Sequence, residues 1–551
     1  MDIFIFSFLT SLLYFCAGNL FNKNKINDFN NIIKNFFIGI TFVSFLSLII
    51  NFFFPLNKTI NSTIFFLIII YYLFRSKLVI KNNEIIFLFL ITILTFLIIL
   101  KSNVNRPDAG LYHLPYISIL NENKLIFGLS NLHSRFGHVS IMQYLSALNN
   151  NIIFLNNGIV IPLATVISFF YIYFFYEIIK VIIKIDKIDI GKYFSLIITT
   201  YIAYKITRYS SFGNDAIAHL CFFYLISIVL NDKLKDVDFN YILLIATFTF
   251  LNKPSLGIIY FFPLVIFFVQ YKLNFIIIFK KLFSFPALFL LFWLIKNVFT
   301  SGCLIYPMKS TCFENFKWTN IETIKQASYE GNAWSKGWPD RKDQNISQKN
   351  YIKEFNWLKS WSEVHLKYII KIIIPWAIIV LLIIIATIRN SKKNLDVKIK
   401  NNDSLFISII ISLIGTLTFS FIFPLYRYGY SYIISLISLI CINFIKNYNF
   451  NNKISIFKFI FILSFFIIFS KQFIKITHSN KPLWPNIYTL DQNEFIYKKK
   501  RVKMNNNFSY YLADKGDKLC MYGNSPCTSY KLENKIFYFK KYSYAFLLVQ
   551  N

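Results

Sequence analysis

The sequence lacks the glycine-rich segments that nucleotide-binding sites usually carry. Neither G-x-x-x-x-G-K-[ST] nor G-x-G-x-x-G occurs in the 551 residues, so we expect no nucleotide-hydrolysing domain. The amino terminus also lacks the positive region of a cleavable signal peptide, because no Lys or Arg precedes the first apolar run. Cys16 lacks the preceding small residue that a lipoprotein site needs. We therefore expect the first apolar segment to stay in the mature protein.

Acidic residues are scarce. The chain has 26 Asp and Glu residues against 58 Lys and Arg residues, which gives a formal net charge of +32. Its abundant Ile, Phe, Asn and Lys are typical of AT-rich coding, so part of the lysine excess reflects composition and not a binding partner. The positive charge therefore does not by itself indicate a nucleic-acid ligand, and we expect none.

Long apolar runs are abundant. Hydrophobic residues make up 56% of the chain, and the mean hydropathy is +0.51, which is far above that of an ordinary soluble domain. A run of about 20 apolar residues crosses the hydrocarbon core of a bilayer. We therefore predict an all-α integral membrane protein with about fourteen spans. The spans start near Ile3, Phe36, Thr63, Ile85, Gly158, Tyr193, Ala216, Tyr241, Leu256, Ser284, Ile369, Leu405, Ser431 and Ile454.

The predicted spans divide the chain into transmembrane parts and long external segments. We expect interfacial helices in the external loops and a small α+β fold in the tail, where residues 535–539 have the pattern of a strand. The parts are an N-terminal transmembrane module (1–100), a first external loop (101–157), a transmembrane core (158–300), a second external loop (301–367), the C-terminal transmembrane helices (368–474) and an extracytoplasmic tail (475–551).

The distribution of Lys and Arg predicts an orientation. If the amino terminus is extracytoplasmic, every odd-numbered connection between spans is cytoplasmic, and each of these connections is basic, as the positive-inside rule requires. Both termini and the three long segments then lie outside the cytoplasm. We therefore expect a multi-pass protein of the bacterial inner membrane, surrounded by the lipid bilayer.

The cysteines are consistent with this orientation. Of the seven, three fall within predicted spans, and the other four form the close pairs Cys303/Cys312 and Cys520/Cys527 in external segments. Disulfides persist outside the reducing cytoplasm. The hypothesis is that both pairs are structural disulfides, and the alternative is two chance pairs of free thiols.

The first external loop concentrates charged residues and histidines. It reads NRPDAGLYHLP from residue 105 and HSRFGH from residue 133, and a cluster of charges next to a bilayer is usually functional. Asp108 is the first candidate for a catalytic carboxylate, acting as a general base or holding Mg²⁺ or Mn²⁺. Arg106 and Arg135 suit the binding of phosphate oxygens. His113 suits proton transfer or ligand binding.

Simpler readings of this loop stay open. Asp108 would be a helix cap, and the histidines would be hydrogen-bonding residues at the membrane interface. The segments 111–120 and 141–148 have the apolar spacing of short amphipathic helices, which tend to lie in the interface.

Three more charged residues fall at the external ends of spans. Asp215 precedes the seventh span, Lys253 follows the eighth, and Arg427 opens the thirteenth. Each alone is more typical of a snorkelling or capping residue than of a catalytic one. Their common side of the membrane predicts a basic pocket with one or two acids, suited to a lipid-linked phosphate.

These segments resemble parts of the polytopic glycosyltransferases of the GT-C type. Asp108 resembles the catalytic acid of their early external loop, and residues 138–148, with Tyr-Leu-Ser-Ala, resemble the second interfacial helix. Asp215 in Asn-Asp resembles a later acid-bearing turn, Lys253 a basic residue after the following helix, and residues 424–429 a Pro-x-x-Arg-Tyr turn. The chain also resembles a group of bacterial multi-pass membrane proteins with no assigned activity.

The resemblance implies transfer of a sugar from a polyprenyl-phosphate donor to a lipid, glycan or protein acceptor at the extracytoplasmic face. Asp108, His113 and Asp215 would be catalytic, and Asp108 and Asp215 would hold any Mg²⁺ or Mn²⁺. The donor phosphate would bind the basic residues Arg106, Arg135, Lys253 and Arg427. Two alternatives stay open: an O-antigen polymerase or ligase, and a transporter or flippase for a polysaccharide or lipid. Transporters usually place charges near the bilayer midplane and have paired halves, which the sequence does not show.

Overall fold

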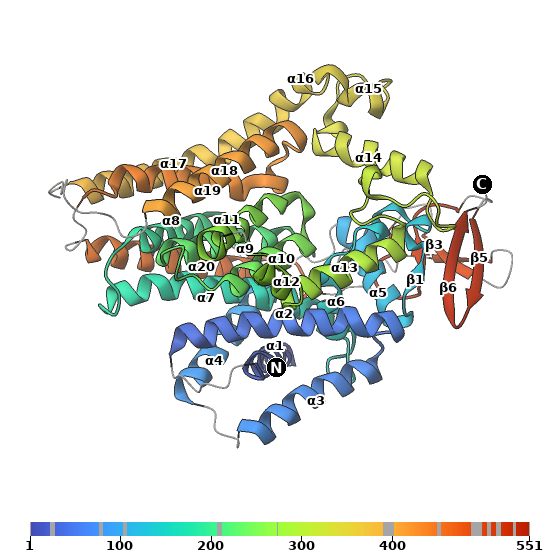
Figure 1. Ribbon diagram of the computed structural model, residues 1–551, viewed down its shortest axis with the longest axis horizontal. Helices are drawn as coiled ribbons and strands as arrows, with labels where there is room; N and C mark the ends of the chain where they lie inside the picture. Colours follow the sequence, from blue (N-terminus) through green and yellow to red (C-terminus); the bar gives the residue numbers. More distant parts are fainter. Residues whose placement is uncertain are drawn as a thin grey trace.

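The structure is a computed structural model that describes most of the chain. The described residues are 2–21, 28–76, 81–102, 107–205, 212–272, 274–389, 402–448, 453–485, 499–503, 509–513, 519–532 and 536–549. They form an elongated bundle of helices with a small group of strands at one end (Figure 1).

A helix coincides with every predicted span. In the described residues, ten helical segments are long and apolar enough to cross a membrane. The helices α9, α10 and α13 are apolar but shorter, so the multi-pass helical character is shown, while the count of fourteen stays a prediction. The helices are α1 (Asp2–Asn19), α2 (Phe29–Phe53), α3 (Lys58–Ser76), α4 (Asn82–Ile99), α7 (Ile161–Ile182), α8 (Ile190–Lys205), α9 (Asp215–Asn231), α10 (Phe239–Asn252), α11 (Phe261–Tyr271), α13 (Phe285–Ser301), α17 (Lys367–Ile388), α18 (Asn402–Ile422), α19 (Tyr426–Ile445) and α20 (Ile454–His478).

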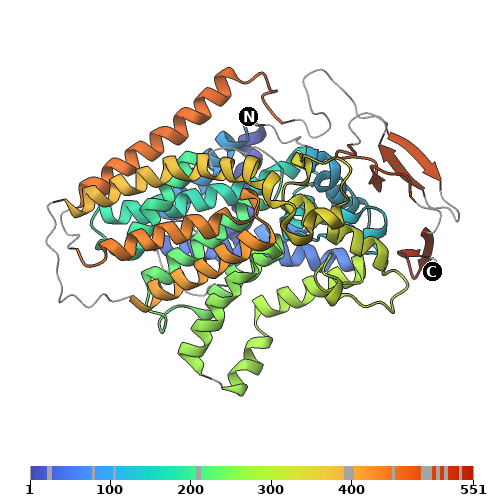
Figure 2. The same cartoon turned by 90° about the horizontal axis from the view of Figure 1, so that it is seen from above.

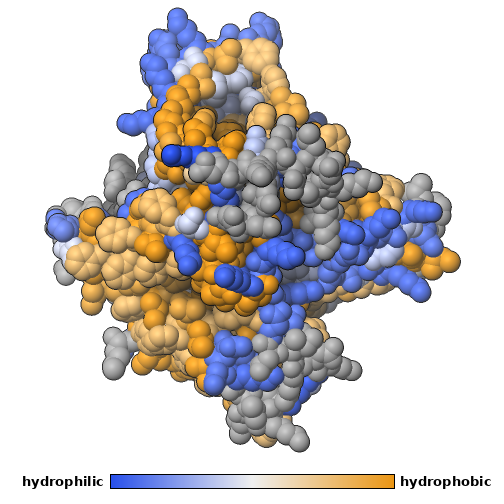
Figure 3. Space-filling model, turned by 90° about the vertical axis from the view of Figure 1, so that its left-hand side faces the viewer, coloured by the Kyte–Doolittle hydropathy of each residue, from blue (hydrophilic) through white to orange (hydrophobic). Residues whose placement is uncertain are grey.

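Burial differs sharply between inner and outer helices. The side chains of α7 are buried along almost its whole length, and hydroxyl groups inside the bundle donate to the carbonyl one turn back, as Ser44 does to Ile40 at 2.7 Å. The outer helices instead expose large apolar side chains, such as Phe459 and Phe466 of α20. Figure 3 looks onto the end of the bundle opposite the strands and shows hydrophobic side chains there next to hydrophilic ones. The apolar side chains exposed along the outer helices fit contact with lipid.

Two glycines allow α1 and α2 to cross closely. A Cβ atom on Gly39 would overlap the carbonyl oxygen of Tyr14, and one on Gly18 would overlap that of Asn35. Backbones can approach this closely only where both helices carry small residues.

The first external loop forms the predicted helices. It contains a π-helical turn (Ala109–His113) and the helices α5 (Leu114–Glu122) and α6 (Ile141–Leu148). Every residue of α6 is buried, because α2, α5, α7 and α10 surround it. The polar face of the amphipathic α6 therefore makes its contacts inside the protein, and the position of these helices in the membrane interface stays a prediction.

The second external loop and the tail lie at the same end of the bundle as the first loop (Figures 1 and 2). The second loop contains short helices, of which α14 (Ile321–Ser335) is the longest, and Asn131 of the first loop donates to the Trp318 carbonyl at 3.0 Å. The other helices outside the predicted spans are α12 (Phe275–Leu282), α15 (Gln348–Ile352) and α16 (Leu358–Trp361).

The described part of the tail contains strands, and no helix follows α20 in the described residues. The strands of the predicted α+β tail are therefore present, and its helical part stays a prediction. Helix α20 continues to His478, past the predicted start of the tail at residue 475. Strand β6 pairs in parallel with β1 of the first loop and antiparallel with β5, and β3 pairs with both β2 and β4. The strands are β1 (Ile126–Phe127), β2 (Lys499–Lys503), β3 (Ser509–Ala513), β4 (Cys527–Thr528), β5 (Ile536–Lys541) and β6 (Tyr544–Val549).

Both external cysteine pairs form disulfides in the structure, Cys303–Cys312 in the second loop and Cys520–Cys527 in the tail. The remaining cysteines in the described residues, Cys16, Cys221 and Cys441, are free and lie in helices of the bundle.

We expect Gly39→Ala to destabilise the protein by about 1–3 kcal/mol, because the added methyl group forces α1 and α2 apart. Gly331→Ala in α14 is the matched control, since no heavy atom lies within 4 Å of the added Cβ, and alanine favours a helix. The midpoint of thermal unfolding in detergent measures both effects. Equal midpoints for the two variants would show that the close crossing does not contribute to stability.

Candidate functional site

A cavity of about 750 Å³ lies at the loop end of the bundle. Six of the seven residues predicted to be catalytic or phosphate-binding line it, although they come from four separate segments of the sequence. The seventh, Arg106, lies outside the described residues. The six are Asp108, His113, Arg135, Asp215, Lys253 and Arg427.

Asp108 and Arg427 form an ion pair at the cavity wall. Arg427 Nη1 lies 3.1 Å from Asp108 Oδ2, and the two side chains are 48% and 46% exposed. Asp108 precedes the π-helical turn, but its carboxylate makes no capping hydrogen bond. The interpretation of Asp108 as a helix cap is therefore wrong. The half-exposed carboxylate remains open to a ligand in the cavity.

The first turn of α19 fixes the backbone of Arg427. Its carbonyl oxygen accepts a hydrogen bond from Lys253 Nζ at 2.7 Å and lies 3.0 Å from His219 Nε2. Gly429 departs from helical geometry within this turn, and a Cβ atom there would overlap the ring of Phe419. The Arg427 guanidinium also donates to the Tyr428 hydroxyl at 3.0 Å. Both ends of Arg427 are thus held by neighbouring groups.

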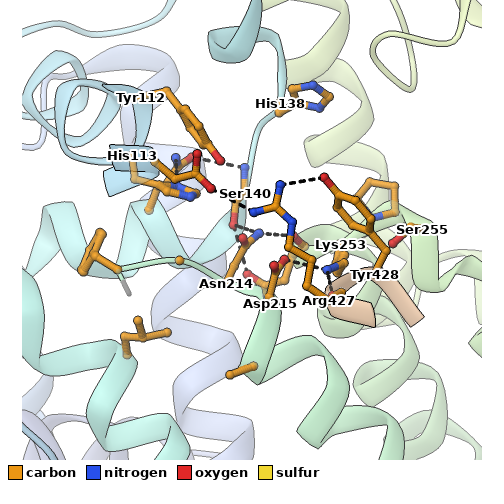
Figure 4. Close-up of a pocket in the computed structure, with 18 of the residues that line it drawn as sticks. Tyr112, His113, His138, Ser140, Asn214, Asp215, Lys253, Ser255, Arg427 and Tyr428 are labelled. Atoms are coloured by element: carbon orange, nitrogen blue, oxygen red, sulfur yellow. Dashed lines mark hydrogen bonds and ion pairs between the residues drawn. The ribbon is translucent and has the colours of Figure 1, made fainter. Parts of the chain in front are cut away.

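Lys253 and Asp215 form a second ion pair below Arg427. Lys253 Nζ lies 2.6 Å from Asp215 Oδ1, and the lysine side chain is only 7% exposed. Burial lowers the pKa of the Lys253 ammonium, although the Asp215 carboxylate acts in the opposite direction. Asp215 is the first residue of α9, where the helix dipole favours a negative charge. Figure 4 shows Asp215, Lys253 and Arg427 side by side.

Amide and hydroxyl groups link the segments beneath these ion pairs. Asn214 Nδ2 donates to Ser140 Oγ at 2.8 Å and to the Asn252 carbonyl. The Asn252 side-chain oxygen accepts from Ser140 Oγ at 3.3 Å and from the backbone N–H of Met142 at 3.1 Å. These bonds connect the ends of α6, α9 and α10. They form a hydrogen-bond network beneath Asp215, Lys253 and Arg427 (Figure 4).

His113 is neutral at neutral pH. Burial lowers the pKa of His113 from 6.5 to about 4, against the opposing charges of Asp108 and Asp215. His113 Nδ1 lies 3.1 Å from the Gln143 amide nitrogen. His138 also lines the cavity, but it is exposed. The ring of His138 packs edge-on against Tyr306.

Arg135 lies above the ion pairs and leaves donor groups available. Its Nη2 is 3.5 Å from Glu330 Oε1, which is a long contact, and its guanidinium carbon is 6.0 Å from the ring centroid of Tyr112. With Lys205, the described residues lining the cavity include four basic side chains against two carboxylates. The excess of two positive charges suits an anionic ligand.

The residues do not by themselves form a metal site. Within the part of the chain that the structure describes, no group of three or more His, Cys, Asp or Glu side chains could hold a metal ion. Asp108 and Asp215 are each paired with a basic side chain, which competes with a metal for the carboxylate. The expected role of Mg²⁺ or Mn²⁺ stays a prediction.

Some site residues were not predicted. Tyr428 is the tyrosine of the Pro-x-x-Arg-Tyr turn, so the sequence did indicate that it lies next to Arg427 at the site. Tyr306 and Asn252 line the cavity from the second loop and from the end of α10, and nothing in their local sequence indicates it.

We expect acid to destabilise the protein partly through His113, which is 9% exposed. The unfolded chain protonates this imidazole near pH 6.5 and the folded chain only near pH 4. Stability is therefore lost as the pH falls through this window, by about 3 kcal/mol for this group. Thermal midpoints at pH 7.5 and 4.5 should differ less in His113→Gln than in the wild type. An identical difference in both proteins would contradict the assignment.

Comparison with known proteins places the cavity within a family. Neither the curated proteins nor the solved structures gave a match to this chain. Residues 1–434 match a family model described as Domain of unknown function (DUF8201). The matched segment includes all six of the predicted residues that line the cavity, and it ends before the tail. The chain therefore belongs to the DUF8201 family.

Proposed function

We propose that this protein is a membrane glycosyltransferase that moves a sugar from a polyprenyl-phosphate donor to a lipid, glycan or protein acceptor. The observation that carries the proposal is the convergence of Asp108, Asp215, Lys253 and Arg427 on one cavity. The Asp108–Arg427 pair brings a proton acceptor next to a phosphate-binding guanidinium. The GT-C resemblance assigns the same residues to the same two tasks.

The basic side chains would bind the donor phosphate. A sugar phosphodiester carries one negative charge, and the phosphate monoester that leaves carries up to two. Arg427, Lys253 and Arg135 therefore interact more strongly with the leaving group than with the donor, which lowers the barrier. The two excess positive charges of the cavity lining support this assignment. Asp215 would hold the Lys253 ammonium in place.

Asp108 would act as the general base. An acceptor hydroxyl oxygen attacks the anomeric carbon of the sugar, and the bond between that carbon and the phosphate oxygen breaks. The electron pair leaves with the phosphate, and the hydroxyl proton passes to the Asp108 carboxylate. His113 would pass the proton on to water, because its lowered pKa keeps it neutral and able to accept a proton.

The upper part of the cavity would bind the sugar. Tyr112, Tyr306 and His138 line it there with flat rings that carry polar atoms. Such rings stack on the apolar faces of sugars and offer hydrogen bonds to their hydroxyl groups. Figure 4 shows Tyr112 and His138 above the ion pairs.

The proposal includes the predicted topology. Fourteen spans with both termini outside put the cavity at the extracytoplasmic face of the bacterial inner membrane, where a lipid-linked sugar would reach it. Two observations support this orientation: helices coincide with the predicted spans, and all three long segments meet at one end of the bundle.

We expect Asp108→Asn to fold normally and to lower sugar transfer by about 10²–10⁴-fold, the usual contribution of a general base. Asp403→Asn is the matched control, because Asp403 is an exposed residue in the first turn of α18. The measurement is transfer of radiolabelled sugar from a panel of polyprenyl-phosphate sugars in proteoliposomes. Full activity of Asp108→Asn would refute the catalytic role. Movement of an intact lipid-linked sugar between leaflets without transfer would favour a flippase.

We expect Arg427→Gln to weaken binding of a polyprenyl monophosphate by about 10–100-fold, because a charge-assisted bond to phosphate is lost. Arg427→Lys keeps the charge and should have a smaller effect. Titration of the lipid into protein in nanodiscs measures both. Unchanged affinity in Arg427→Gln would place the phosphate elsewhere.

A further inference from the structure

The tail returns to the first external loop and packs on the segment that carries Asp108. Strand β6 adds to β1, and the Tyr530 hydroxyl lies 2.9 Å from His133 Nε2. The Tyr522 hydroxyl donates to Asn121 Oδ1 at 3.0 Å. These residues are more than 390 positions apart in the sequence, and none of the tail lies in the segment that the family model matches.

One further contact is made to the π-helical turn itself. The backbone N–H of Met521 donates to the Gly110 carbonyl at 2.8 Å. A Cβ atom on Gly110 would overlap Met521 Sδ and lie 3.4 Å from Leu519 Cβ. Met521 is 2% exposed. Its side chain therefore fills the space beside the turn, two residues from Asp108.

A disulfide closes the part of the tail that makes this contact. Cys520 and Cys527 are bonded and buried, and Met521 lies between them with a φ of +51°, a conformation that L-residues rarely adopt. Ser118 of α5 donates to the carbonyl of Gly523 in the same loop. The closed loop 520–527 is thus attached to the first loop both at the turn and in α5, which follows the turn.

We propose that the disulfide-closed loop 520–527 is a positioning element for Asp108. It holds residues 109–113 in the π-helical form that directs the carboxylate toward Arg427. The role of Asp108 as a catalytic base rests on the proposed function, whereas the contact between Met521 and Gly110 does not. The tail is then a part of the site and not a separate domain.

The π-helical turn explains why support is needed. A π-helix holds one more residue per turn than an α-helix and is the less stable form, so it persists where other contacts fix it. Relaxation to an α-helix would rotate the preceding residue by about 100° around the helix axis. Asp108 would then leave Arg427, to which it is bonded at 3.1 Å.

Paired substitutions test the contact directly. Gly110→Ala introduces the overlap with Met521, and Met521→Ala leaves an empty space, so each should raise the hydrogen-exchange rate of amides 109–114 by about tenfold or more. The double variant Gly110→Ala/Met521→Ala places the new methyl group in the vacated space and should recover most of the protection. If the two effects simply add in the double variant, the Met521–Gly110 contact does not position the turn.

The disulfide is tested with a matched pair of variants in the full-length protein. Cys520→Ser/Cys527→Ser should lose protection at 109–114, whereas Cys303→Ser/Cys312→Ser, which removes the other external disulfide, should not. Equal losses, or no loss in either, would overturn the proposal.

A second readout separates this inference from the proposed function. We expect Met521→Ala and Cys520→Ser/Cys527→Ser to lower the rate of sugar transfer, because Asp108 moves out of position. The affinity for a polyprenyl monophosphate should stay within about twofold, because the phosphate-binding Lys253 does not move. Met521→Leu, which fills a similar volume, should restore the rate. Absent transfer in the wild type, together with the exchange pattern above, would refute the glycosyltransferase and leave the positioning element standing. A normal transfer rate in Met521→Ala would refute the positioning element alone.

Discussion

Arg427 is the residue on which the rest of the site depends. Its guanidinium binds Asp108 from the first loop, and its carbonyl oxygen receives Lys253 from the end of α10. Three segments that are distant in the sequence therefore meet at one residue at the start of α19. A bundle whose interior is apolar has few other ways to hold charges near the bilayer, because each unpaired charge is costly there. The ion pairs therefore hold the three segments together and also supply the charged groups of the cavity.

The helices and most of the charged side chains of the cavity could be predicted from the sequence, because each depends on local signals. Apolar runs define the helices, and charges at span ends on one side define Asp108, Asp215, Lys253 and Arg427. The burial of α6 could not be predicted in this way. An amphipathic pattern shows that a helix has a polar face, but not whether lipid or another helix covers the opposite face. The pairing of β6 with β1, which is only two residues long, has no local signal either.

A neutral histidine and charged arginine and lysine side chains line the same cavity. Burial removes the positive charge from His113 at neutral pH, so this imidazole does not contribute to the attraction for an anion. Arginine keeps its charge at any pH that the folded protein experiences, and its fork-like donors suit phosphate. A ligand therefore meets fixed positive charges next to an uncharged imidazole, whereas a histidine exposed to water would titrate near neutral pH.

The parallel pairing of β1 with β6 has a consequence for biosynthesis. Strand β1 ends at Phe127, and its partner begins at Tyr544, so the whole segment between them is synthesised before the pair can form. In the proposed topology the helices between the two strands must also be inserted first, because both strands have to reach the same side of the membrane. Contacts of such long sequence separation form late in folding. A nascent or truncated chain would therefore have these helices and the Lys253–Asp215 pair while the turn carrying Asp108 still lacked its partner. The cavity would then be completed only after these helices are inserted.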